Sequence, residues 1–157
     1  MKLALGTVQF GLDYGVANTA GRVSEADARG IMAQAAQRGM DILDTAIAYG
    51  DSERVLGGLG VSQWKVVTKL PIVPRQCVDV VDWVEKEIKQ SMNRLKVNQL
   101  HGVLLHRPDQ LLDSIGQDLY LGLKTIKENG LTKRIGVSIY EPVELNQIFD
   151  RFDFDLV

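Results

Sequence analysis

Extended apolar segments alternate with segments of helical periodicity along the whole chain. We expect six strands, at Lys2–Gln9, Met40–Thr45, Lys65–Leu70, Gln99–His106, Arg134–Ile139 and Phe154–Val157. The middle four are nearly continuous apolar runs, which is typical of strands that are covered on both faces. The pattern therefore indicates a sheet buried inside the molecule.

The segments between these strands carry apolar residues three and four positions apart, which is the spacing of an amphipathic helix. We expect helices at Ser24–Arg38, about Ser52–Leu59, Val78–Leu95, about Ile115–Asn129 and from Glu141-Pro142 onward. In the first helix, Ser24 is a suitable N-cap residue, Asp27 holds the capping-box position and Ile31 belongs to the apolar stripe. Gly39 supplies the left-handed residue that ends many helices. In the last helix, we expect Pro142 at the first helical position.

The alternation of strands and helices predicts parallel βαβ units with right-handed crossovers. Two architectures contain such units, a doubly wound open sheet and a (β/α)8 barrel. An open sheet that binds dinucleotides carries G-x-G-x-x-G after its first strand, whereas this stretch reads Gly6-Thr7-Val8-Gln9-Phe10-Gly11. We therefore expect an α/β fold of the TIM-barrel type, with residues 1–157 in one domain. A complete barrel takes about 250 residues, so we expect an incomplete one with about six strands.

Composition and charge narrow the class of protein. The 157 residues include 18 Lys and Arg against 20 Asp and Glu, a net charge of −2 that offers no electrostatic footprint for nucleic acid or a membrane surface. No apolar run approaches the roughly 20 residues of a membrane span, and the start does not read as a secretory signal. A single cysteine, Cys77, with two histidines leaves no disulfide framework or structural zinc site. We expect a cytoplasmic protein without a metal.

Ionisable side chains stand where successive predicted strands end. Asp44 lies near the end of the second strand and Lys69 near the end of the third, and His106 closes the fourth. Reactive groups of a barrel lie at these carboxyl ends. The alternation of side chains along neighbouring strands lets Asp44 and Lys69 meet, and a lone buried charge would be costly. Tyr49 follows in the loop after Asp44 and can bring its phenol over the mouth of the barrel. Taken alone, Asp44 and Lys69 are equally well explained as a structural ion pair.

The segment 44–57 reads Asp-Thr-Ala-x-x-Tyr-Gly-x-Ser-Glu-x-x-Leu-Gly, and it resembles the signature of the aldo-keto reductases. The strands at 66–69 and 104–106 follow in the order of that family, and segments 5–11 and 135–138 also fit its pattern. The resemblance covers essentially the whole chain. All four members of the family's catalytic tetrad find a match, at Asp44, Tyr49, Lys69 and His106.

The resemblance implies reduction of a small-molecule aldehyde or ketone by NAD(P)H, with NADP expected over NAD. It makes Tyr49 the general acid that protonates the carbonyl oxygen, His106 a neutral donor to that oxygen, and Asp44 the residue that holds Lys69. An ammonium about 4 Å from the phenol oxygen stabilises the phenolate by at most roughly 4 kcal/mol. We therefore expect Lys69 to lower the pKa of Tyr49.

The resemblance also assigns contacts with the cofactor to Gly6, Thr7, Asp44 and Ser138. Gly6 and Thr7 end the first strand, where glycine allows close approach of the backbone. Ser138 would bind the carboxamide of the nicotinamide. The family commonly has Asn at the next position, whereas this sequence has Ile139, which offers no amide.

Several residues that look chemically suggestive have plainer explanations. His101 lies near the amino end of the strand that His106 closes, and we expect it to be structural. Tyr120 and Lys124 match the Tyr-x-x-x-Lys pair of the short-chain dehydrogenases, but the glycine-rich turn that this other family needs after its first strand is missing. Trp64 and Trp83 are expected to be packing residues. Arg107 has two open interpretations, a contact with the substrate or a cofactor phosphate and simple solvation.

The chain stops at Val157, within the sixth predicted strand. In the family, two further βα units close the barrel, and their loops bind the pyrophosphate and adenosine of the cofactor. We expect a fragment of a longer reductase with an incomplete cofactor site; the alternative is a short product that associates through its open strand edge. Two other functions stay open, a non-catalytic binding or regulatory subunit on the same fold and a barrel enzyme that handles phosphates, such as an isomerase.

Overall fold

The computed structural model describes residues 3–157, which form a parallel sheet of five strands. The strands are β1 (Ala4–Gly6), β2 (Ile42–Asp44), β3 (Lys65–Leu70), β4 (Gly102–Leu105) and β5 (Ile135–Val137). Each strand pairs in parallel with the next strand in sequence, in the order β1-β2-β3-β4-β5. A doubly wound sheet reverses its strand order, and this sheet does not. The fold is therefore of the TIM-barrel type, and within the described residues the barrel stays open between β1 and β5.

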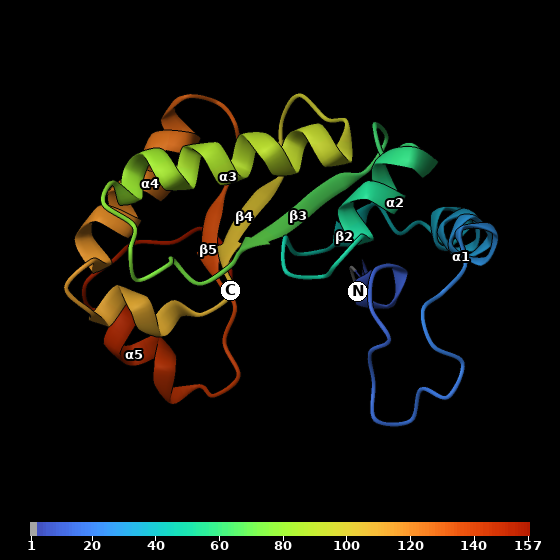
Figure 1. The fold of residues 1–157 in the computed structure, drawn as a ribbon, viewed down its shortest axis with the longest axis horizontal. Coiled ribbons are helices and arrows are strands. Elements are labelled where there is room, and N and C mark those ends of the chain that lie inside the picture. Colours follow the sequence, from blue (N-terminus) through green and yellow to red (C-terminus); the bar gives the residue numbers. More distant parts are fainter. Residues whose placement is uncertain (1–2) are drawn as a thin grey trace.

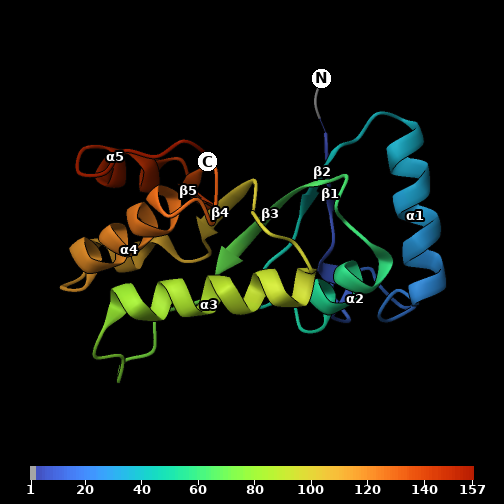
Figure 2. The same cartoon turned by 90° about the horizontal axis from the view of Figure 1, so that it is seen from above.

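Five α-helices connect and follow the strands (Figure 1). They are α1 (Glu25–Gln37), α2 (Ser52–Leu59), α3 (Val80–Leu95), α4 (Gly116–Glu128) and α5 (Val143–Phe149), with short 3₁₀ helices at Val8–Phe10 and Pro108–Leu112. Helices α1 to α4 pack on one another in sequence order. Figure 2 shows α1 and α5 at opposite ends of the molecule, with the sheet and α3 between them. The helices thus cover the outer face of a curved half-barrel.

The hydrophobic core lies between these helices and the outer face of the sheet. On β3, Val66 and Leu70 face the core, and the charged Lys69 lies on the opposite face. Trp64 and Trp83 pack against the edge of the core, as expected of packing residues. Full burial of an aliphatic side chain stabilises a fold by about 1.5–3 kcal/mol. The largest fully buried apolar side chains are Leu43, Leu56, Leu70, Ile88, Leu95, Leu100, Leu111, Leu119, Leu123, Ile126 and Ile148.

Strand β3 matches its prediction residue for residue, whereas the other strands are shorter than predicted. The first strand was expected at Lys2–Gln9; its start at Lys2 lies outside the described residues, and its end turns into the 3₁₀ helix Val8–Phe10. The turn forms because the N–H groups of Phe10 and Gly11 bond back to Thr7 and Val8 instead of continuing the sheet. The strand therefore stops at Gly6, level with Asp44 of β2.

The sixth predicted strand, Phe154–Val157, makes only one bridge, from Leu156 to Gly136 of β5. Two backbone hydrogen bonds begin a ladder, from Asp155 N–H to Ile135 and from Val137 N–H to Leu156. A strand needs neighbours and length to be stable, and this segment pairs on one side only within the described residues. The carboxylate of Asp155 ties it down by accepting from the N–H of Ile135 at 2.9 Å and from Lys127 at 2.7 Å.

Helix α1 has the ends that the sequence predicts. The hydroxyl of Ser24 accepts the N–H of Asp27 at 3.1 Å, and Gly39 follows the helix with φ of 79°. The apolar stripe is narrower than expected, because Ile31 is 38% exposed. Helix α1 packs mainly on α2 at one end of the open sheet, so only part of its apolar surface finds a neighbour.

Two other helices begin later than predicted. Helix α3 starts at Val80, because the side chain of Asp79 accepts the N–H of Asp82 at 2.9 Å and caps the helix there. Val78, predicted to be helical, is fully exposed before the cap. Helix α5 starts at Val143, so Pro142 is its N-cap and not its first helical residue.

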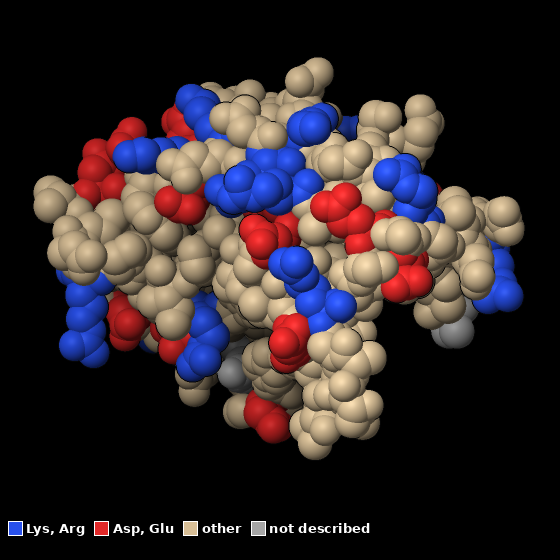
Figure 3. All heavy atoms as spheres, turned by 45° about the vertical axis from the view of Figure 1, so that its right-hand side comes forward, with Lys and Arg blue, Asp and Glu red and all other residues tan. Residues whose placement is uncertain are grey.

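The surface shows no large field of one sign on the face seen in Figure 3, where basic and acidic side chains are interspersed. No helix within residues 3–157 combines the length and the apolar character needed to cross a bilayer. In the same stretch, no group of histidine, cysteine and acidic side chains is arranged to hold a metal ion.

Candidate active site

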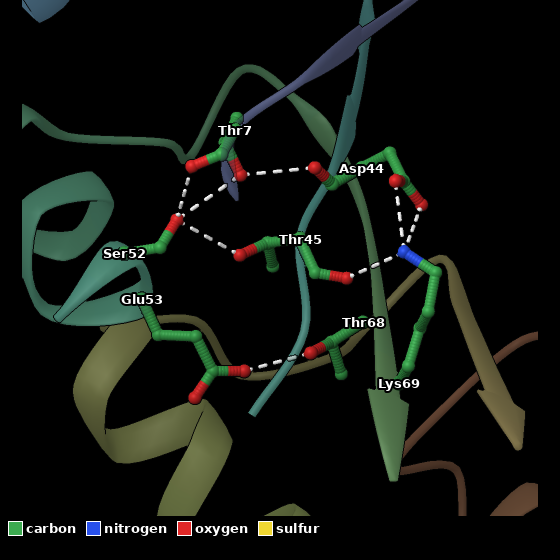
Figure 4. A network of polar contacts seen from close by, with 7 residues as sticks. All are labelled: Thr7, Asp44, Thr45, Ser52, Glu53, Thr68 and Lys69. Carbon is green, nitrogen blue, oxygen red and sulfur yellow. Dashed lines mark hydrogen bonds and ion pairs between the residues drawn. The ribbon is translucent and has the colours of Figure 1, made fainter. Parts of the chain in front are cut away.

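The carboxyl ends of β2 and β3 bring Asp44 and Lys69 together on the inner face of the sheet (Figure 4). The Nζ of Lys69 lies 2.8 Å from each carboxylate oxygen of Asp44 and 3.0 Å from the carbonyl oxygen of Thr45. An ammonium has three N–H donors, so each has an acceptor here. Lys69 is only 5% exposed, whereas the side chain of Asp44 keeps 35% of its surface. The cation is therefore buried and fixed, and the carboxylate still faces open space.

Tyr49 comes from the loop between β2 and α2 and reaches the same end of the sheet. The Nζ of Lys69 lies over the face of its ring, 5.1 Å from the centroid. The ring of His106, just after β4, meets it edge to face, with centroids 5.6 Å apart and planes at 84°. Such contacts between a cation and a ring and between two rings are attractive. All four predicted residues thus form one cluster at one rim of the half-barrel.

The pKa of Tyr49 is shifted in the direction opposite to our expectation. Burial raises it above its ordinary value of 10.0, and the negative charge of Asp44 and the nearby Tyr140 and Tyr14 raise it further. The expected lowering by Lys69 is wrong for this structure. Asp44 binds the Lys69 ammonium through both oxygens, so the carboxylate cancels much of the field of the cation at Tyr49. The cation also lies over the face of the Tyr49 ring. Tyr49 is therefore fully protonated at neutral pH.

The pKa of His106 is lowered from its ordinary value of 6.5, chiefly by burial and next by the positive charge of Lys69. The cation of Arg107 adds to this effect, and the carboxylate of Asp44 opposes it. His106 is therefore neutral at neutral pH. A neutral imidazole can donate one N–H to a bound oxygen, as the role expected for this residue requires.

A groove of about 400 Å³ opens beside His106. Its lining consists of Ala48, Pro71, Ile72, His106, Arg107 and Tyr140. Apart from the histidine and the arginine, sequence analysis did not single these residues out. The available signal was position, since Pro71 and Ile72 directly follow β3 and Tyr140 lies shortly after β5. The groove places an apolar wall and a cation next to the cluster.

Three of the four residues expected to contact a cofactor end or follow the strands at the two ends of the sheet, β1 and β5. Gly6 is exposed, and a Cβ atom placed there would meet nothing within 4 Å. Ser138 is half-buried, and its N–H donates to the carbonyl oxygen of Leu105 at 2.9 Å. Thr7 is completely buried, and its hydroxyl donates to the carbonyl oxygen of Asp44 at 2.9 Å. Space for a ligand thus lies above Gly6, while the side chain of Thr7 belongs to the framework under the site.

Two residues with alternative explanations lie away from the cluster. Arg134 contacts the Nε2 of His101 at 2.6 Å, at the amino end of β4 and far along the strand from His106. The hydroxyl of Tyr120 donates to the carbonyl oxygen of Asp153 at 3.0 Å and also accepts the N–H of that residue. Both side chains have structural partners.

The sequence profile of the Aldo/keto reductase family matches residues 2–157. Among curated proteins, an aldo-keto reductase of Mycolicibacterium vanbaalenii is 30% identical over 139 residues, which are 82% of this chain and 46% of that protein. An aldo-keto reductase of Mycobacterium sp. is 28% identical over 139 residues, with 83% and 46% covered. The chain therefore spans about half the length of the curated relatives it matches.

Solved structures agree with the profile. A Pseudomonas aeruginosa aldo-keto reductase superposes with a TM-score of 0.77 at 27% identity, over 96% of this chain and 60% of that one. A Bombyx mori aldo-keto reductase in complex with NADP shares the fold with a TM-score of 0.68 at 24% identity, over 95% and 50%. With the profile matching nearly every residue and the predicted tetrad gathered at one rim, the chain belongs to the aldo/keto reductase family.

Proposed function

We propose that the chain supplies the catalytic rim of an enzyme that reduces an aldehyde or ketone to an alcohol with a reduced nicotinamide cofactor. The observation that carries the proposal is the cluster of Asp44, Tyr49, Lys69 and His106 beside an open groove. We also propose that residues 1–157 are part of a single barrel domain, since the matched relatives are about twice as long.

Tyr49 is the proton donor in this proposal. Its raised pKa keeps the phenol protonated at neutral pH, which is the form that a general acid needs. The carbonyl oxygen of the substrate gains negative charge during reduction and becomes more basic than a phenolate. The proton of Tyr49 then moves to that oxygen without the phenol having to be a strong acid.

His106 and Lys69 prepare the place of this transfer. The neutral imidazole donates an N–H to the carbonyl oxygen and orients it, which is an oxyanion-type contact. Lys69, bound by Asp44, lies over the face of the Tyr49 ring, and the imidazole of His106 packs against that ring edge to face. Lys69 and His106 therefore act together mainly by fixing the position of the Tyr49 ring.

The residues at the rim fit a nicotinamide group. Gly6 leaves open space at the end of β1, Asp44 offers a partly exposed carboxylate within the cluster, and Ser138 follows β5. NADPH, when bound, supplies the hydride. The choice of NADP over NAD is supported by the NADP complex of the Bombyx mori neighbour.

The test is a reductase assay on the chain joined to the rest of its barrel, with an aldehyde panel and the absorbance of the reduced cofactor as readout. Tyr49→Phe removes the proton donor, so we expect a loss of about 10²–10⁴-fold in kcat. Tyr120→Phe is the matched control, because it removes a hydroxyl outside the cluster. The proposal fails if no carbonyl compound is reduced, or if Tyr49→Phe behaves like the control.

A further inference from the structure

A chain of buried hydroxyls joins the ends of β1 and β2 to the start of α2 (Figure 4). The hydroxyls of Thr45 and Ser52 are 3.1 Å apart, and Ser52 donates to the carbonyl or the hydroxyl of Thr7, at 2.9 and 3.1 Å. The hydroxyl of Thr7 donates to the carbonyl oxygen of Asp44 at 2.9 Å. Thr7, Thr45 and Ser52 are completely buried.

The direction of this chain follows from its proton count. A carbonyl oxygen accepts only, so the proton of Thr7 is committed to Asp44. Ser52 then donates to Thr7, which leaves Ser52 as the acceptor for Thr45. Every hydroxyl in the chain therefore has a donor role, and removing Ser52 would leave partners on both sides without their hydrogen bond.

Both ends of the hydroxyl chain reach residues that hold Lys69. Thr45 accepts the third N–H of the ammonium through its carbonyl oxygen, and Asp44 accepts the other two through its carboxylate. Ser52 thus braces the two consecutive residues that fix the cation, Thr45 directly and Asp44 through Thr7, although it makes no contact with the cation.

Ser52 also sits at the end of the loop that carries Tyr49. A Cβ atom at Gly11 would lie 1.8 Å from the carbonyl oxygen of Tyr49 and 2.4 Å from the nitrogen of Ser52. Gly50 has φ of 56°, and a Cβ there would lie 2.7 Å from the carbonyl oxygen of Gly11. The loop therefore packs backbone to backbone on the segment after β1, and the Ser52 hydroxyl holds it in that place.

The hydroxyl of Ser52 does not serve its own helix. The N-cap of α2 is Asp51, which makes no capping bond through its side chain, and the hydroxyl of Ser52 bonds instead to the residues that follow β1 and β2. We propose that Ser52 is a positioning residue, which sets the Asp44–Lys69 pair and the Tyr49 ring in their working arrangement. The inference rests on the proposed function for its catalytic meaning, but not for its test.

The test follows the two imidazoles of the chain by NMR as pH is varied. In the unaltered chain, burial and the charges of Lys69 and Arg107 hold the pKa of His106 below its ordinary value, against the opposing charge of Asp44. In Ser52→Ala, the cation and the Tyr49 ring are held less closely and water reaches the imidazole. We expect the pKa of His106 to move up towards its ordinary value.

His101 lies at the other end of β4 and is the internal reference, so we expect its titration to stay unchanged in Ser52→Ala. Thr45→Val removes one hydroxyl at nearly constant shape and should raise the pKa of His106, whereas Thr45→Ser keeps the hydroxyl and should leave it where it was. Thr132→Val removes another buried hydroxyl, which donates to the carbonyl of Arg134 away from the site. It should lower stability without moving the His106 titration.

The proposal is overturned if the pKa of His106 in Ser52→Ala equals that of the unaltered chain. It is also overturned if Thr45→Val and Thr45→Ser give the same pKa for His106. The Thr45 pair decides the matter by itself if Ser52→Ala does not fold. The titration needs no turnover, so a failed reductase assay and a failed positioning role are separate results. In an active reductase, displacement of the reacting groups by about 1 Å costs up to about 100-fold. We expect Ser52→Ala to lose up to that much in kcat, with KM nearly unchanged.

Discussion

Two ion pairs, Asp44–Lys69 and Glu53–Arg94, lie on opposite faces of β3. They contact the strand at the neighbouring residues Lys69 and Thr68. On the inner face, Lys69 binds Asp44, whose side chain is 35% exposed. On the outer face, Thr68 donates to Glu53 of α2 at 2.7 Å. Glu53 also accepts from Ser91 at 2.6 Å and from Arg94 at 2.8 Å, both on α3, and its side chain is 2% exposed.

The difference between the pairs lies in what their oxygens have left to do. The oxygens of Glu53 are taken up by three donors from one strand and one helix, so this outer pair joins elements and is closed to any ligand. Asp44 keeps part of its surface exposed, and the pair belongs to the cluster whose His106 lines the open groove. Burial has a price even in the outer pair, because the Nη2 of Arg94 is buried without a hydrogen-bond partner among the described residues. We infer that the outer pair fixes the architecture and the inner pair is available for chemistry.

The largest effect on stability should come from breaking the outer pair. Glu53→Ala leaves the Arg94 cation partly buried and uncompensated, and we expect the free energy of unfolding to fall by about 3–5 kcal/mol. Urea denaturation followed by circular dichroism measures it. The double variant Glu53→Ala, Arg94→Met removes both charges and should regain part of the loss. A cost for Glu53→Ala below that of any substitution at the rim would refute the comparison.

Breaking the inner pair should cost less. Lys69→Met leaves Asp44 without its partner, but this carboxylate is already partly hydrated and can take up water. We expect a loss of about 1–3 kcal/mol, measured in the same denaturation experiment. A loss equal to that of Glu53→Ala would mean that the inner pair is as much a part of the architecture as the outer one.

The smallest effect should be a dependence of stability on pH that originates at the rim. The pKa of His106 is lower in the folded chain than its ordinary value of 6.5. Between these two pKa values, the folded state therefore binds fewer protons than the unfolded state. The contribution of His106 to the free energy of unfolding is complete when the pH is above the ordinary pKa. It is lost as the pH falls from there through the folded pKa. We expect thermal unfolding to occur at lower temperature below pH 6 than at pH 7.

The variant His106→Asn should flatten this dependence only in part, because His101 has a lowered pKa as well. His101→Asn is the matched control and should remove the remaining part. If His106→Asn unfolds with the same pH dependence as the unaltered chain, the rim imidazole is not held neutral in the way the structure indicates.

Much of the fold and the membership of the cluster follow from local pattern. The segment Lys65–Leu70, rich in β-branched residues, was predicted to be a strand and became β3 residue for residue. The period of two along β2 and β3 is enough to put Asp44 and Lys69 on one face. The segment Phe154–Val157 has the same apolar character but formed only one bridge, because a strand depends on neighbours that no local pattern supplies.

The electrostatics of the cluster did not follow from the sequence. From the sequence we expected the ammonium of Lys69 to lower the pKa of the Tyr49 phenol. The direction of a pKa shift, however, depends on angles and distances that the sequence does not contain. In the structure the ammonium is held by the carboxylate and lies over the ring face, and burial dominates. The roles of these residues in catalysis stay a prediction that the reductase assay will decide.

The sequence by itself determined where the five strands lie along the chain and on which face of the sheet their side chains stand, because side-chain alternation is a property of the local backbone. Only the tertiary structure decided which partners those residues have. Glu53 meets Ser91 and Arg94, and Ser52 meets Thr7, across separations of 38 to 45 residues. Such contacts are selected by how whole helices pack on the sheet, and their effect on charge and solvation exists only once the chain is folded.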